Sequence, residues 1–151
     1  MKKSFILLVV IAFSGITLAQ ELPSDVDKVY KGAEKLKNKK EYKLAIVEYK
    51  EVLRSVNHVP SMVSIGEISM ELMSPPNYRM AYEYYDKAIQ ELGIQILGAS
   101  KDKEKARLGQ QIEELTPKRN RAKSYVDDFD KAKDKKQEGN RLMEGEEEDV
   151  D

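Results

Sequence analysis

The pattern of hydrophobic and polar positions repeats along the chain. Between residues 41 and 53 the order Tyr, Ala, Tyr and then a branched aliphatic residue recurs 36 residues later, between residues 77 and 89. These positions are three or four apart, a spacing that places them on one face of an α-helix. A fixed period of tens of residues is typical of stacked helical units, in which neighbours bury one another's apolar faces. The pattern therefore predicts an all-α fold.

A second apolar stripe precedes the first in each unit, so each unit is interpreted as two helices. In the first unit the stripe consists of Val29, Ala33 and Leu36, which are four and three residues apart. The matching positions of the second unit are Ile65, Ser69 and Leu72. Pro75 and Pro76 cannot both lie inside a helix, so they mark the turn between the two helices of the second unit.

Small residues on these stripes allow the helices to approach each other closely. We therefore expect Ala45 and Ala81 to be buried where two helices cross, with large tyrosine side chains filling the space around them. The tyrosines assigned to the core are Tyr42, Tyr49, Tyr78, Tyr82 and Tyr85.

The alanine followed four residues later by an aromatic, present as Ala45 with Tyr49 and as Ala81 with Tyr85, resembles the tetratricopeptide repeat family. The resemblance implies antiparallel helix-turn-helix repeats stacked as a short right-handed α-solenoid. It places two repeats within residues 24–92, at about 26–59 and 62–95. Two family positions differ, because the family's tryptophan is replaced by Val29 and Ile65 and its glycine by Ala33 and Ser69.

The C-terminal part matches the repeat less closely. Residues 93–100 are predicted to be an apolar linker, followed over 101–145 by a degenerate third helix pair and a capping helix. Pro117, after Thr116, is interpreted as the first residue of a new helix. The pair is either a third repeat or a plain hairpin that caps the array. Residues 146–151 form an acidic tail, and Lys136 with Asn140 resembles a carboxylate clamp of some family members, although the other clamp positions are not matched.

The N-terminus predicts export. Residues 1–19 combine two lysines, an apolar run and a small-residue cleavage site, which is typical of a bacterial signal peptide. The alternative is an uncleaved anchor, but the apolar run is shorter than a membrane-spanning helix requires. Cleavage removes Lys2 and Lys3, which leaves 24 basic residues of the original 26 against 27 acidic ones, a net charge of −3. We therefore expect a periplasmic or secreted protein with no membrane anchor and no nucleic-acid partner.

Cysteine and histidine, two residue types common in catalytic and metal sites, are scarce in this chain. It has no cysteine and a single histidine, His58, which we expect to be solvent-exposed in a turn between repeats. The sequence contains no phosphate loop, zinc motif or calcium loop. We therefore expect a protein that is not an enzyme and needs no cofactor and no metal.

The resemblance implies that the first helices of successive repeats line a concave groove for another protein or peptide. Tyr30, Met70 and Met73 are predicted to form an apolar, partly accessible patch in that groove. The full set of expected groove residues is Asp27, Tyr30, Glu34, Lys37, Asn38, Gly66, Met70 and Met73. The expected function is thus a non-enzymatic adaptor or scaffold of the cell envelope. The alternative is a structural homo-oligomer whose repeats stack end to end through Leu142 and Met143.

Overall fold

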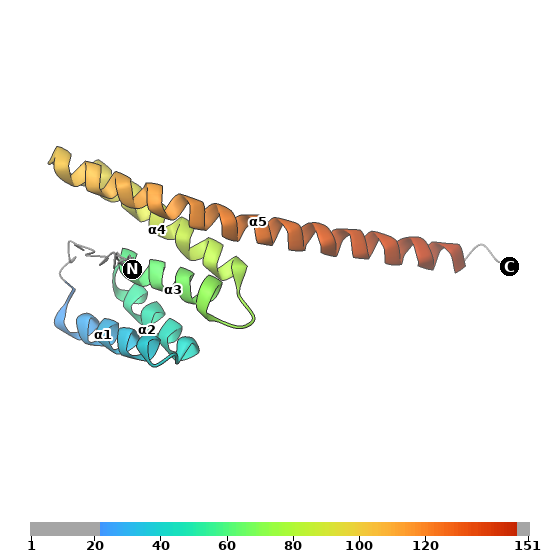
Figure 1. The fold of residues 1–151 in the computed structure, drawn as a ribbon, viewed down its shortest axis with the longest axis horizontal. Helices are drawn as coiled ribbons and strands as arrows, with labels where there is room; N and C mark the ends of the chain where they lie inside the picture. Colours follow the sequence, from blue (N-terminus) through green and yellow to red (C-terminus); the bar gives the residue numbers. More distant parts are fainter. Residues whose placement is uncertain (1–21, 148–151) are drawn as a thin grey trace, which may run out of the picture.

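The fold is all-α. A computed structural model describes residues 22–147, and the side chains of residues 22–141. The expected signal peptide and the last residues of the acidic tail lie outside this range. The elements are helices α1 (Ser24–Asn38), α2 (Tyr42–Ser55), α3 (Val59–Glu67), a π-helical turn η1 (Ile68–Leu72), α4 (Tyr78–Gly98) and α5 (Asp102–Glu147), arranged as in Figure 1.

The helices pack as antiparallel neighbours in chain order. Helix α1 pairs with α2, α3 with α4, and α4 with the first half of α5. One core cluster lies between the first hairpin and α3, around Ala33, Tyr49 and Ile65. The other lies between α3, α4 and α5, around Tyr85 and Leu108. Each helix thus buries its apolar stripe against the next one along the chain.

The predicted helix crossings are confirmed. Ala45 and Ala81 are both fully buried, one in each core cluster. Tyr49 and Tyr85, the two repeat-matched tyrosines that follow them, are also fully buried. The remaining tyrosines assigned to the core, Tyr42, Tyr78 and Tyr82, are half-buried at its edges.

The second unit departs from the first at the π-helical turn. The amide of Met73 donates to the carbonyl of Ile68 at 2.9 Å, a bond one residue longer than in an α-helix. The extra residue rotates the side chains that follow it around the helix axis. As a result Met70 is buried, whereas Leu72, the predicted match to half-buried Leu36, is exposed.

The C-terminal prediction is wrong in two respects. Residues 93–98 are the last turns of α4 and not a linker. Residues 102–147 form a single helix that runs through Pro117 in place of a helix pair and a separate cap. The reason is the apolar seam of Leu108, Leu115 and Ala122, which packs continuously on α4 from both sides of the proline. This packing outweighs the cost of a proline inside a helix, which is about 3 kcal/mol.

Candidate functional site

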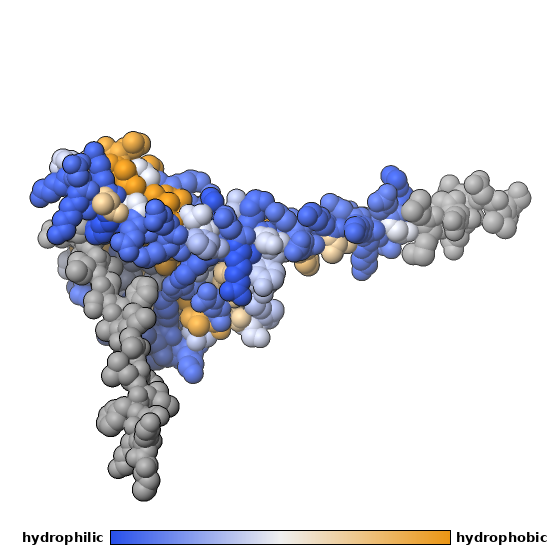
Figure 2. Space-filling model, turned by 45° about the horizontal axis from the view of Figure 1, so that its top comes forward, coloured by the Kyte–Doolittle hydropathy of each residue, from blue (hydrophilic) through white to orange (hydrophobic). Residues whose placement is uncertain are grey.

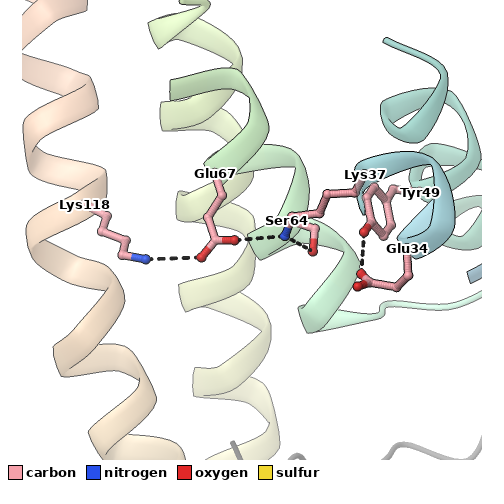
Figure 3. A network of polar contacts seen from close by, with 6 residues as sticks. All are labelled: Glu34, Lys37, Tyr49, Ser64, Glu67 and Lys118. Atoms are coloured by element: carbon pink, nitrogen blue, oxygen red, sulfur yellow. Dashed lines mark hydrogen bonds and ion pairs between the residues drawn. The ribbon is translucent and has the colours of Figure 1, made fainter. Parts of the chain in front are cut away.

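A chain of polar contacts joins α1, α3 and α5. The ammonium group of Lys37 on α1 donates to Glu67 on α3 at 3.1 Å and to the hydroxyl of Ser64 at 3.4 Å. The second carboxylate oxygen of Glu67 accepts from Lys118 on α5 at 3.3 Å. Figure 3 shows Glu67 between the two lysines, with all three side chains lying across the helices. The contacts therefore connect the three helices that would line the expected groove.

A second group of contacts, between α1 and α2, lies beside this chain of polar contacts. The hydroxyl of Tyr49 donates to Glu34, and the rings of Tyr30 and Tyr49 are 6.1 Å apart between centroids. Burial, and then the Glu34 charge, raises the pKa of Tyr30 to about 12. Burial and the bond to Glu34 raise the pKa of Tyr49 as well. Both phenols are therefore neutral at ordinary pH, and the polar groups of this region are satisfied within the chain.

His58 is buried, so the expectation of an exposed turn histidine is wrong. Its Nδ1 lies 2.8 Å from the Ser61 hydroxyl, and its ring meets Tyr30 edge to face with centroids 4.7 Å apart. Burial lowers the pKa of His58, while the charge of Glu34 opposes that shift. His58 directly precedes α3 and packs its imidazole under α1, a role that the turn position did not reveal.

The structure brings together only part of the expected groove. Tyr30, Glu34 and Lys37 follow one another along α1 at spacings of four and three. Asp27 pairs with Lys31 nearer the start of the helix, and Asn38 is exposed at its end.

The other three expected residues do not join a groove surface. Gly66 is buried, and a Cβ atom there would meet the ring of Tyr85 at 2.7 Å. Met70 is buried in the core of α3, α4 and α5, so it cannot form an accessible patch with Tyr30. Met73 packs partly on the first core cluster and lines a different surface.

That different surface is an open apolar groove of about 570 Å³ where α5 leaves the rest of the fold. We call it the α5 groove. Its floor combines the loop before α4 with the middle of α5, and Tyr78 stacks on Tyr125 with ring centroids 4.2 Å apart. Its lining residues are Lys43, Met73, Ser74, Pro75, Pro76, Asn77, Tyr78, Arg79, Tyr125, Val126 and Phe129. Phe129 remains 68% exposed and Tyr125 40% exposed, so the groove presents aromatic surface to solvent.

Sequence reasoning missed the α5 groove as a surface. Val126 and Phe129 continue the seam of Leu115 and Ala122 at spacings of four and three, the spacing of one helical face. Helix α4 begins at Tyr78, beside Tyr125, so it cannot cover Phe129 one turn further along α5. An apolar seam longer than its partner helix is the signal that could have found the groove.

Beyond the groove, α5 projects alone from the body of the fold. Figure 1 shows the C-terminal half of α5 without a neighbouring helix, and Figure 2 shows that the part of this half drawn in colour is hydrophilic over most of its surface. A second apolar area lies at the tip of the α4–α5 hairpin, where Ile94 and Leu97 are exposed. The projection therefore begins at an apolar groove and continues as a charged helix.

The comparisons identify no relative. No protein-family model, curated protein or solved structure matches the chain. Over residues 22–147, none of the helices combines the length and the apolar character needed to cross a membrane. Within the same range, no three histidine or acidic side chains gather as a metal would require.

Proposed function

We propose that this chain is an exported, non-enzymatic adaptor that binds a segment of polypeptide in the α5 groove. The observation that carries the proposal is the exposed aromatic surface at the point where α5 extends beyond the start of α4. Tyr and Phe side chains in a preformed hollow are the anchors that protein interfaces use most effectively. The stacking of the helix pairs as a right-handed solenoid, which the family resemblance implies, belongs to the same proposal.

The α5 groove suits a ligand better than the polar face of α1, α3 and α5. On that face Lys37, Glu67 and Lys118 already satisfy one another, and a ligand would have to break those bonds. In the α5 groove a ligand would instead cover apolar atoms of Phe129 and Tyr125. Each square ångström of apolar surface removed from water contributes about 25 cal/mol, so the gain there is not offset by lost ion pairs.

Site-specific photo-crosslinking in cells tests the proposal. A photoreactive phenylalanine analogue in place of Phe129 should capture a polypeptide, because the side chain stands in the groove. The same analogue in place of Lys105, exposed on the first turn of α5, is the matched control. Mass spectrometry of the captured species identifies the chain that is bound. Equal capture from both positions, or none from position 129, would show that the α5 groove binds no polypeptide.

A further inference from the structure

We infer that the occupant of the α5 groove is the C-terminal segment of a second copy of this chain, in an antiparallel pair of α5 helices. The inference rests on the proposed function, since it names the polypeptide that the groove binds. It requires three things: an apolar match for the groove, a helix long enough to reach it, and charges that agree in the antiparallel direction.

The apolar match comes from the helix face that the groove already uses. Val126 and Phe129 continue at alternating steps of four and three to Lys133, Lys136, Asn140 and Met143. Positions spaced in this way form the seam along which two helices pair. Met143 is the next apolar residue of this seam after Phe129, and Leu142 precedes it. The projecting helix thus has apolar residues at both ends, and an antiparallel pair brings the start of one helix next to the end of the other.

The register follows from symmetry. A two-fold axis between Asp134 and Lys135 places Val126 of one copy beside Met143 of its partner, and Phe129 beside Asn140. Met143 of each copy therefore lies at the mouth of the other copy's groove. Both grooves are filled by one contact surface, as a two-fold interface requires. A straight helix cannot turn back, so the segment cannot fill the groove of its own chain.

The charges agree with this direction. Residues 144–151 carry six acidic side chains and no basic one. In the antiparallel direction this acidic stretch points toward residues 118–125, whose charged side chains are Lys118, Arg119, Arg121 and Lys123, with no acidic residue among them. Lys118, Arg119 and Lys123 are paired within the chain with Glu67, Asp86 and Asp127. Arg121 is exposed, and Lys43 adds a further positive charge at the groove. A parallel pair would place the acidic segments side by side.

One feature of the register is unfavourable. Lys133 faces Lys136 of the other copy near the two-fold axis. Lysine on a helix seam lowers stability but restricts the number of registers that a pair can adopt, and its long stem lets the ammonium group reach solvent. The pair is therefore expected to be reversible and to weaken in high salt, which screens the contribution of the acidic segment.

Cysteine crosslinking tests the register, because the chain has no cysteine of its own. A Val126→Cys chain mixed with a Met143→Cys chain should form a disulfide-linked pair under mild oxidation. Each variant alone should stay uncrosslinked, because like positions in the pair lie about 25 Å apart along the helix, at about 1.5 Å per residue over 17 residues. That distance is far beyond the reach of a disulfide. Crosslinking of either variant alone, or none in the mixture, would overturn the register.

Sedimentation equilibrium tests the association itself. The protein should dimerise reversibly, and Phe129→Glu should weaken the dimer by at least about tenfold, which corresponds to about 1.4 kcal/mol. Arg121→Glu should weaken it as well, because it replaces an exposed positive charge near the groove with a negative one, which repels the acidic C-terminal stretch of the partner. Circular dichroism at dilute concentration shows that each variant is folded. A monomer at every concentration overturns the dimer.

The two proposals fail in different ways. If the photo-crosslinker at position 129 captures another protein and sedimentation shows a monomer, the groove binds a polypeptide but not a second copy. If it captures this chain itself, both proposals stand. If it captures nothing and the protein is a monomer, both are overturned.

Discussion

Close packing at single residues decides how α3 meets α4. Gly66 was expected in a binding groove, but it lies where a Cβ atom would stand 2.7 Å from one ring carbon of Tyr85 and 2.9 Å from two others. The ring is fully buried and cannot move aside without disturbing Ala81 and Ala88 in the same cluster. Gly66→Ala should therefore lower the free energy of unfolding by about 1–3 kcal/mol, as overpacked cores do.

Gly109→Ala is the matched control, because it also lies in a helix and a Cβ atom there would meet nothing within 4 Å. It should leave stability unchanged or raise it by up to about 1 kcal/mol, since alanine favours helices over glycine. Urea unfolding of both variants measures the difference. If Gly66→Ala is as stable as the control, the contact with Tyr85 is not as tight as described.

The sole histidine makes the stability depend on pH. Burial between Tyr30 and Ser61 lowers the pKa of His58 below 6.5, so the unfolded chain binds a proton more readily than the folded one. The contribution of neutral His58 is fully present above about pH 6.5 and is lost as the pH falls through the folded pKa. Stability should thus begin to decline as the pH falls below about 6.5, which is above the range where most carboxylates titrate.

Thermal unfolding across this range measures the effect, and His58→Gln serves as the comparison because it keeps polar groups but does not titrate. The slope should be flatter in the variant than in the parent. The same slope in both proteins would show that other groups cause the pH dependence. A turn histidine gave no sequence signal for this role, because burial beneath α1 is set by how the hairpins pack.

At the scale of the helices, the sequence predicted the spacing of the apolar positions but not the π-helical turn or the continuous helix through Pro117. The period of apolar positions located α1, α2, α3 and the start of α4, and Ala45 and Ala81 are buried as expected. The π-helical turn was not predicted, because one extra residue leaves no mark on composition and only shifts which side chains face inward. That shift is why Met70 lies in the core and is absent from the expected groove.

Pro117 led to a wrong prediction because its local preference and its packing environment conflict. Local chemistry favours a break at proline, whereas the seam of Leu108, Leu115 and Ala122 favours one continuous helix. Pro117 has no amide hydrogen to donate to the carbonyl of Glu113, four residues earlier. The nearby Thr116 hydroxyl donates to the carbonyl of Ile112 at 2.7 Å and does not replace that bond. Pro117→Ala should restore the missing bond and raise the free energy of unfolding by about 1–3 kcal/mol.

The control for this substitution is Glu114→Ala, which is also exposed on α5 but changes no backbone amide. It should shift stability by no more than about 0.5 kcal/mol. Chemical denaturation of the two variants, followed by the circular dichroism of their helices, measures the difference in stability. A Pro117→Ala chain no more stable than the parent would mean that the helix already accommodates the proline without strain.

At the scale of the whole molecule, the chain divides into a packed body and a projecting helix. The body holds both core clusters, and Ala122 is the last buried residue of α5 in the described side chains. Arg79 on α4 pairs with Asp130 at 2.8 Å, which marks the end of contact between α5 and the body. The repeat pattern predicted the body, because its periodicity reflects burial. It could not predict the groove, because that surface depends on where one helix ends beside another.

A stop codon after Lys131 should therefore leave the body as stable as the full chain, because none of residues 132–141 belongs to either core cluster. The measurement must be made at high dilution, where self-association adds nothing to the apparent stability. At high concentration the full chain should unfold at a higher temperature than the shortened one, since only the full chain can bind its partner's groove.

A stop codon after Thr116 is the contrasting variant, because it removes Ala122 and the ion pair from Arg119 to Asp86. That chain should lose several kcal/mol, a large share of the 5–15 kcal/mol that small proteins typically have. A shortened chain ending at Lys131 that unfolds early even when dilute would show that the projecting helix supports the body directly. The division between a folding unit and a binding arm would then be wrong.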